Sequence, residues 1–203
     1  MPKARTLSGR ARFAVLCFLT AALLPSLSRA QAPVFEITPG DSKVTFFVKA
    51  SVALEGTFEK WGATLVFTSP DVSTGVLDIK IQAASVDTGS GMKNGKLKSK
   101  DFFNVEQDPT ITFLSKKITQ TGPTTFDLDG DFTIRGVSKP ETLKLTVSGA
   151  GTGSGEINGT MAFDRKDYGM DKGIPFVKIA DRVEVTVNLH AKRISGPPVA
   201  LKQ

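Results

Sequence analysis

Few side chains in this sequence could carry out covalent chemistry. His190 is the only histidine, and it lies on the polar side of an alternating segment, where a solvated ring is more common than a general base. The only cysteine, Cys17, lies in an apolar segment near the N-terminus. No Gly-x-Ser-x-Gly nucleophile turn occurs in the sequence. The residue types therefore do not favour a serine or cysteine hydrolase.

Three carboxylates alternate along one segment, at Asp127, Asp129 and Asp131. Paired carboxylates can act as acid and base in hydrolysis, so an exported carboxylate-dependent hydrolase stays open as an alternative. The run also begins like a calcium loop, but that loop needs Gly and Glu where this chain has Phe132 and Ser138. Because the sequence also has no cluster of His and Cys for zinc, we expect no metal, no cofactor and no enzymatic activity.

The elements that position these residues are strands, because apolar residues recur with period two in most of the sequence. The clearest segment is 182–190, in which four apolar residues alternate with polar ones. Turn sequences rich in Gly and Pro separate about eight or nine such segments. Only 88–103 breaks the alternation, and there Leu97, Phe102 and Phe103 are expected to form the buried side of a short helix.

A series of antiparallel strands of this kind forms either a sandwich or a closed barrel. Closure pairs every strand edge without special edge residues, which favours the barrel. We therefore predict an all-β fold, namely an antiparallel eight-stranded barrel with one short helical insertion. Such a barrel can hold one small ligand. A structural or adhesive β-domain with a filled core has the same strand pattern and stays open as an alternative.

The first thirty residues have the character of an export signal. Basic residues precede the apolar stretch from Phe13 to Leu24, which is too short to span a membrane, and Ser28-Arg29-Ala30 is a small-x-small cleavage site. We expect cleavage after Ala30 and a periplasmic or secreted protein without stable membrane insertion. Removing residues 1–30 takes five basic residues from a chain of net charge +6 and leaves +1. We therefore expect no nucleic-acid partner.

Several runs of residues match the motifs of a known family, namely Ser42 to Val48 with Gly56 to Phe58, Ser85 to Gly89 with Leu97 to Val105, Asp108 to Phe113, Gly130 to Pro140, and Asp164 to Met170. On these runs, nearly the whole of residues 31–203 resembles the YceI-like proteins, a group of exported lipocalin-like barrels associated with polyisoprenoid binding. The family usually has an Arg-Asp pair and a His before the helix leucine, where this chain has Lys93-Asn94 and Lys96. Lys does not reproduce the bidentate geometry of Arg. A head-group contact that the family makes through this Arg therefore cannot be transferred directly to this chain.

The resemblance implies a single lipocalin-like domain over residues 31–203, with a tail from about residue 195 that we expect to be disordered. It also implies that inward apolar residues line a lipid site in place of a filled core. The expected lining consists of Val44, Phe46, Phe67, Leu77, Ile79, Ile81, Ile111, Phe113, Phe126, Leu128, Phe132, Ile134, Leu145, Val185 and Val187.

Recognition of a lipid head group would have to come from the rim of the barrel, since the interior lacks fixed polar groups. The candidates are Lys93, Lys96, Lys98, Arg135, Arg165 and Tyr168. For each, a solvated charge or a structural pairing is the alternative. The expected function is to sequester or carry a polyisoprenoid or similar long-chain amphiphile, and the expected partner is an isoprenoid, quinone or fatty-acid-like lipid. A homodimer stays open.

Overall fold

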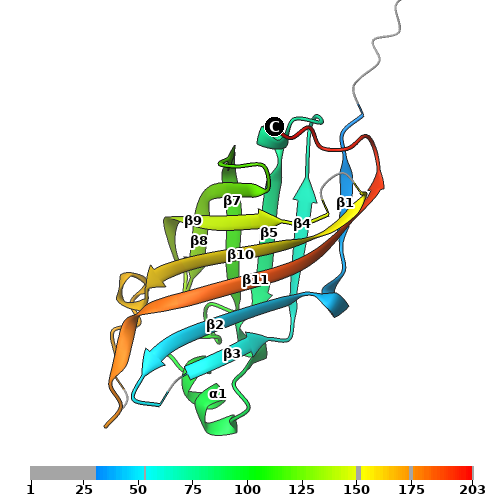
Figure 1. Cartoon of the computed structure of the whole chain (residues 1–203). Helices are drawn as coiled ribbons and strands as arrows, with labels where there is room; N and C mark the ends of the chain where they lie inside the picture. The colour runs from blue at the N-terminus through cyan, green and yellow to red at the C-terminus, as the bar shows by residue number, and fades with distance from the viewer. Residues whose placement is uncertain (1–30, 53, 150–151, 174–175, 203) are drawn as a thin grey trace, which may run out of the picture.

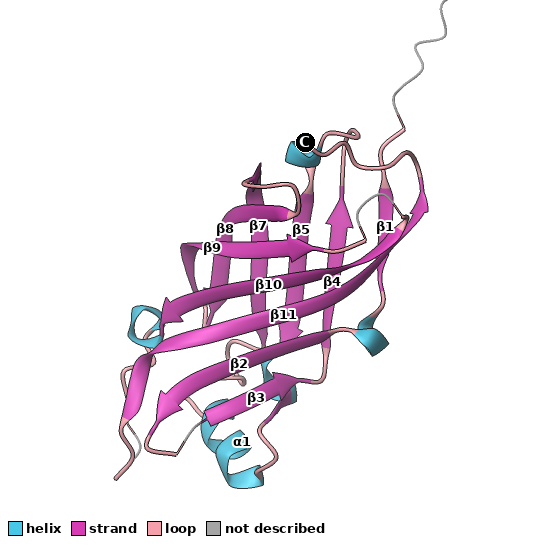
Figure 2. Ribbon diagram, in the orientation of Figure 1, coloured by secondary structure: helices cyan, strands magenta, loops and turns pink. Residues whose placement is uncertain are grey.

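The computed structural model of this 203-residue chain describes residues 31–52, 54–149, 152–173 and 176–202. The expected export signal at residues 1–30 lies outside the described residues. In the described part, eleven strands form one antiparallel sheet that curls into a barrel (Figures 1 and 2). The strands are β1 (Val34–Ile37), β2 (Lys43–Ala50), β3 (Leu54–Phe58), β4 (Trp61–Val66), β5 (Val76–Gln82), β6 (Val86–Asp87), β7 (Thr110–Gln120), β8 (Thr125–Ile134), β9 (Val137–Val147), β10 (Ser154–Asp164) and β11 (Ile179–Ser195).

The barrel closes because β11 is long enough to pair with two different strands along one edge. The part of β11 that precedes residue 189 pairs with β2, and residues 191–195 pair with β1. β1 in turn meets β4 at Val34 and Val66. The closed ring therefore consists of β1, β4, β5, β7, β8, β9, β10 and β11. This confirms the predicted antiparallel eight-stranded barrel.

Period-two alternation places one row of side chains from each strand inside the barrel. The inward row of β8 contains Gly130 between larger apolar residues, and β7 bulges opposite this glycine, between Ser115 and Lys117. A Cβ on Gly130 would lie 2.4 Å from the backbone oxygen of Leu114, so the bulge requires glycine. The hydroxyl of the buried Ser115 accepts a hydrogen bond from the backbone N–H of Leu77 at 2.8 Å. A side chain thus supplies an acceptor where the regular ladder is interrupted.

One end of the barrel, which we call the lower end, is closed by α1 (Gly91–Lys98) and the loop that follows it (Figure 1). The predicted short helix is present, and Leu97 is its buried residue. Phe102 and Phe103 are also buried, but they lie in the turn after the helix and not on its buried side, which corrects that part of the prediction. The ring of Phe103 lies 5.9 Å from that of Phe58 and 6.3 Å from that of Phe46. Within the described residues, no helix is both long enough and apolar enough to cross a membrane.

The opposite end, the upper end, is crossed by residues 197–202, which we call the C-terminal strap (Figure 1, red). The strap begins after Gly196, whose φ of 78° and close approach to Ala32 exclude a side chain. Here the structure differs from the expectation of disorder beyond about residue 195. The backbone N–H of Ala200 donates to the carbonyl of Pro70 at 2.7 Å, and Leu201 packs against the core. Apolar contact and backbone pairing together order a segment that has no strand pattern of its own.

Candidate functional site

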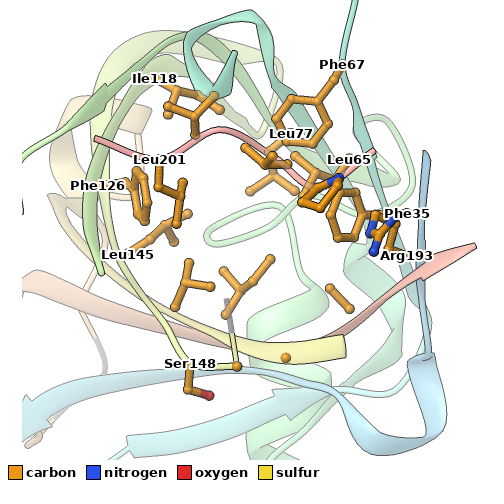
Figure 3. A pocket seen from close by; sticks show the side chains of 18 of the residues that line it. Phe35, Leu65, Phe67, Leu77, Ile118, Phe126, Leu145, Ser148, Arg193 and Leu201 are labelled. Carbon is orange, nitrogen blue, oxygen red and sulfur yellow. The ribbon is translucent and has the colours of Figure 1, made fainter. Parts of the chain in front are cut away.

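An apolar cavity of about 130 Å³ lies inside the barrel directly beneath the C-terminal strap, and we call it the upper cavity. Every strand of the closed ring contributes to its wall. The lining residues include Phe35, Leu65, Leu77, Ile118, Phe126, Leu128, Leu145, Val147, Ile157 and Ala191 from the strands, Phe67 and Val72 from the β4–β5 connection, and Pro198, Val199 and Leu201 from the strap. Figure 3 shows Phe35, Phe126 and Leu201 directed into the same space. An apolar cavity of about 150 Å³ can stay dry and bind a guest the size of benzene.

A second cavity of about 60 Å³, the lower cavity, lies inside the barrel above α1. Its wall is rich in aromatic rings, with Phe46, Phe58, Phe102, Phe103, Phe132 and Phe163 among the lining residues. Leu97 of α1 forms part of the wall, so the helix closes this cavity from below. The space itself is about half the size of the upper cavity, and it too is surrounded almost entirely by hydrocarbon.

A layer of buried side chains, which we call the waist, separates the two cavities. On β5, Leu77 lines the upper cavity and Ile81 the lower one, while Ile79 between them lines neither. Phe113 is the cross-strand partner of Ile79 and likewise faces neither cavity. The waist consists of Ile79, Phe113, Leu143, Val187 and Leu189, all at most 4% exposed. A long chain that filled both cavities would therefore have to displace the waist.

The predicted apolar lining divides among these three levels of the barrel. The upper cavity receives Phe67, Leu77, Phe126, Leu128 and Leu145, and the lower cavity receives Val44, Phe46, Ile81, Ile111, Phe132, Ile134 and Val185. Ile79, Phe113 and Val187 belong to the waist. The structure thus places the fifteen residues in the interior, and their contact with a lipid stays a prediction. Residues that the sequence analysis missed are those outside the main strand rows, such as Phe35, Val72, Ile118, Val199 and Leu201.

Arg165, a predicted rim residue, is buried and donates hydrogen bonds to the protein itself. It begins the 3-10 turn η4 (Arg165–Tyr168) after β10. Its Nε donates to the carbonyl of Ala180 at 3.2 Å, and its Nη1 donates to the carbonyls of Met170 and Lys172. Its Nη2 donates to the carboxylate of Asp181 at 3.0 Å. The guanidinium therefore fastens η4 to the start of β11, and its aliphatic part borders the lower cavity.

Two lysine–aspartate pairs lie near the lower end. Lys166 donates to Asp181 at 2.7 Å, and this hydrogen bond, together with the charges of Lys166 and Arg165, holds the pKa of the Asp181 carboxyl below its usual value. Lys96, another predicted rim residue, donates to Asp101 at 2.7 Å and lowers the pKa of that carboxyl in the same way. Both aspartates are thereby kept ionised, so each neutralises a neighbouring cation that a lipid head group would otherwise meet.

Tyr168 is fully buried, although the sequence analysis placed it at the rim. Its hydroxyl donates to the Glu141 carboxylate at 3.0 Å, and its ring packs edge-on against Phe132 and Phe163, at 5.5 and 5.1 Å between ring centres. Burial, and then the hydrogen bond to Glu141, raise the pKa of the phenol well above its usual value. Tyr168 is therefore held as a neutral donor within the protein.

The remaining rim candidates also lie around the lower end. Arg135 has a φ of 56° and donates to the carbonyls of Lys100 and Gly169, so it ties the β8–β9 turn to the segments after α1 and η4. Lys93 and Lys98 are half-buried on α1.

The larger, upper cavity is bordered by a different cation, Arg193, which sequence analysis missed. The sequence did contain a signal for Arg193, because the inward row of β11 continues with period two from Leu189 to this residue.

The carboxylate row of β8 lies on the outer face of the barrel. Asp131 pairs with Lys116 at 2.6 Å, and Asp129 accepts a hydrogen bond from the hydroxyl of Thr142 at 2.8 Å. These two carboxylates bond to neighbouring strands and line neither of the two interior cavities. In the part of the chain that the structure describes, no group of three or more His, Cys, Asp or Glu side chains could hold a metal ion.

Comparison with known sequences agrees with this fold. The YceI-like domain family matches residues 35–191, which include nearly all of the barrel. A UPF0312 protein from Pseudomonas savastanoi pv. phaseolicola is 30% identical over 122 residues, which cover 58% of this chain and 64% of the relative. Protein YceI from Escherichia coli O17:K52:H18 is 34% identical over 98 residues, or 48% of this chain and 51% of the relative. The matched region thus spans less than two thirds of the length of these curated relatives.

Solved structures show the same architecture. BcnA from Burkholderia cenocepacia superposes with a TM-score of 0.69 at 28% identity, over 76% of this chain and 99% of that chain. A polyisoprenoid binding domain from Saccharophagus degradans, implicated in plant cell wall breakdown, gives a TM-score of 0.63 over 79% of this chain and 99% of that chain. Its identity is 14%, so this likeness concerns the fold alone. With the closed barrel in place and the family matching residues 35–191, the chain belongs to the YceI-like family.

Proposed function

We propose that this protein is an exported carrier that sequesters a polyisoprenoid or similar long-chain amphiphile inside its barrel, without covalent chemistry. The observation that supports this proposal is the upper cavity, an apolar space inside the barrel to which all eight ring strands contribute. A purely structural domain would be expected to fill this space with its own side chains, because close packing stabilises a core. The fold shared with a polyisoprenoid binding domain from Saccharophagus degradans supports the same class of ligand.

The interior favours hydrocarbon strongly and, among the described residues, has no fixed polar group that would select one chain length. Each buried methylene contributes about 0.8 kcal/mol before ordering costs, so a five-carbon isoprene unit would contribute about 4 kcal/mol. The upper cavity has room for roughly one such unit. A longer chain therefore requires the strap, the waist or both to move. Binding energy would rise with every unit that enters, until the barrel is filled.

The polar end of the ligand would lie at an end of the barrel, where cations are available. Arg193 borders the upper cavity, and Lys93 and Lys98 lie on α1 at the lower end. Arg135 and Arg165 already donate to backbone carbonyls. They are therefore less suited to hold an anionic head group than the helix lysines, and Arg193 is in the same position because its guanidinium donates to the carbonyl of Gly196. The basic, apolar and small-residue pattern of residues 1–30 supports a periplasmic or secreted location for the carrier.

The test is mass spectrometry of organic extracts from the natively purified, detergent-free protein, expressed in several hosts. We expect a long-chain lipid in amounts well above a buffer control. The inward substitution Ala191→Phe, which would fill the upper cavity, should lower the lipid content several-fold. The adjacent outward substitution Lys192→Phe is the matched control and should leave it unchanged. Extracts that contain no lipid above the buffer control in any host would contradict the proposed function.

A further inference from the structure

The C-terminal strap spans the diameter of the barrel. It leaves the ring at β11, and its far end is fastened to Gln120 at the end of β7. In the closed ring, β7 lies four strands from β11 in either direction. The strap therefore reaches from one side of the opening to the opposite side, and on the way it contacts the β4–β5 connection at Pro70 and Asp71 (Figure 1, red).

Specific hydrogen bonds fasten the strap at its far end. The side-chain amide of Gln120 donates to the carbonyl of Lys202 at 2.8 Å and accepts from the backbone N–H of Lys202 at 2.7 Å. The backbone N–H of Ala200 donates to the carbonyl of Pro70, and Ala200 forms a β-bridge with Asp71. These contacts satisfy strap backbone groups that lie next to an apolar space. They also involve few residues, so one substitution can weaken them.

The strap also fills space that a ligand would use. Val199 and Leu201 line the upper cavity, and Leu201 packs against the core in the same compartment as Phe126 and Leu145 (Figure 3). The cavity that remains holds about 130 Å³, or roughly one isoprene unit. Moving Leu201 away would therefore both widen the mouth of the cavity and enlarge its volume.

The lower end is closed more firmly. Phe103 is buried between the rings of Phe46 and Phe58, and Arg135 donates to the carbonyl of Lys100 in the loop after α1. Opening this end would expose several aromatic rings and unpair a guanidinium. At the upper end, opening exposes Leu201 and Val199 and breaks the bonds to Gln120 and Pro70. Opening the upper end therefore costs less free energy than opening the lower end, which makes it the favoured entrance for a ligand.

We propose that the C-terminal strap is a gate that an apolar chain must displace to enter the upper cavity, with Leu201 occupying the place of the chain in the unliganded protein. This inference rests on the proposed carrier function, because it names how that site is reached. Gly196 is the hinge at the start of the strap, and Arg193, whose guanidinium donates to the carbonyl of Gly196, holds the hinge in its closed geometry.

The test locks the gate reversibly. Asp71 and Ala200 are bridge partners, and neighbouring strands lie about 4.8 Å apart, within the separation of about 4.4–6.8 Å that a disulfide accepts. The double substitution Asp71→Cys/Ala200→Cys is made in the full chain together with Cys17→Ser, so that the new pair is the only pair of cysteines. The probe is dansyl-labelled farnesol, whose fluorescence rises in apolar surroundings, and its association rate is followed by stopped flow.

We expect the oxidised protein to take up the probe at least tenfold more slowly than the same protein after reduction with dithiothreitol. Gln120→Ala, which removes both hydrogen bonds to Lys202, should raise the association rate of the unlocked protein about tenfold. Asp71→Cys alone controls for loss of the hydrogen bond that this carboxylate accepts from Ser73. Because the oxidised and reduced forms share one sequence, a folding defect cannot produce the difference between them.

Equal rates for the oxidised and reduced forms would overturn the gate and leave the carrier function standing. Failure of every form, including the reduced and Gln120→Ala proteins, to bind the probe would overturn the carrier function and the gate together. A slow oxidised form whose rate recovers on reduction supports both.

Discussion

The hydroxyl of Tyr168 donates to the carboxylate of Glu141 at 3.0 Å, and this places the only tyrosine of the chain, in its neutral form, beside a fixed negative charge. The pair joins η4 to β9 across the wall of the barrel. Burial and the carboxylate both disfavour a phenolate, so the pKa of Tyr168 is raised. The ionisation of this one side chain therefore reports on the integrity of the lower part of the barrel.

This pKa shift predicts a loss of stability at high pH. In the unfolded chain Tyr168 ionises near pH 10, whereas in the folded protein it keeps its proton to higher pH. The unfolded state thus binds fewer protons above about pH 10, and the free energy of unfolding falls as pH rises from there through the folded pKa. Urea titrations at pH 8 to 11 should show this decline in the native protein and a smaller one in Tyr168→Phe. Absorbance at 295 nm supplies the direct check, because a phenolate midpoint near pH 10 in the folded protein would contradict the assignment.

Arg165 should be essential to stability because its guanidinium is buried and donates to several backbone carbonyls. Arg165→Lys keeps the charge but not the planar fork, and we expect the free energy of unfolding to fall by about 2–4 kcal/mol. Arg182→Lys is the matched control, because Arg182 is exposed and pairs with Glu184 at the surface. It should change stability by less than about 0.5 kcal/mol. The free energy of unfolding is measured by urea denaturation. Equal losses in the two variants would show that the buried contacts of Arg165 stabilise the protein no more than a surface ion pair does.

Phe113→Ala should join the two cavities by removing the largest side chain of the waist. We expect a loss of about 3–5 kcal/mol in the free energy of unfolding, accompanied by tighter binding of a 20-carbon isoprenoid alcohol relative to a 10-carbon one. Phe47→Ala, at a 40% exposed position on the outer face of β2, is the control and should alter neither quantity by much. Isothermal titration with the two alcohols measures the effect. An unchanged preference between them in Phe113→Ala would mean that the waist does not limit chain length.

Gly130→Ala should disrupt the bulge of β7. The new Cβ would lie 2.4 Å from the backbone oxygen of Leu114, and backbone cannot rotate away as a flexible side chain can. Strain of this kind costs about 1–3 kcal/mol or more. Gly62→Ala on β4 is the comparison, because a Cβ there meets nothing within 4 Å, and we expect it to be neutral or slightly stabilising. Thermal unfolding of both variants checks the ranking, and a stable Gly130→Ala protein would contradict it.

The sequence correctly predicted which side chains face inward wherever the alternation along a single strand decides this. Phe126, Leu128, Phe132 and Ile134 all face inward as expected, because alternation along β8 continues through Gly130. Ile118 was missed because the bulge between Ser115 and Lys117 adds a residue and shifts the phase of β7. A bulge depends on contacts with the neighbouring strand, so alternation within one segment does not reveal it.

The other differences between the sequence-based expectations and the structure arise from contacts between residues that are far apart in the sequence. The strap has two prolines and no alternation, and its order depends on Gln120, which lies 82 residues earlier in the chain. Arg165 and Tyr168 occur next to a turn, as rim residues do, but their polar atoms reach carbonyls and a carboxylate that tertiary structure brings near. Residue type and spacing indicate that a polar group needs a partner. They do not indicate whether the partner is a ligand or the protein itself.

Because β1 and β2 both pair with the same edge of β11, the N-terminal strands cannot complete their pairing until the C-terminal strand is available. One edge of β2 and most of β1 pair with this last strand, and Thr45 and Thr186, which meet there, are 141 residues apart. Contacts of such sequence separation slow folding, because the entropy of closing the loop must be lost before the pairing is gained. Until β11 has been synthesised, the edges of β2 and β10 lack their partner and are open to pairing with other chains. The nascent polypeptide therefore has to remain unfolded or chaperoned through most of its synthesis, and this is also the state that the proposed export would require.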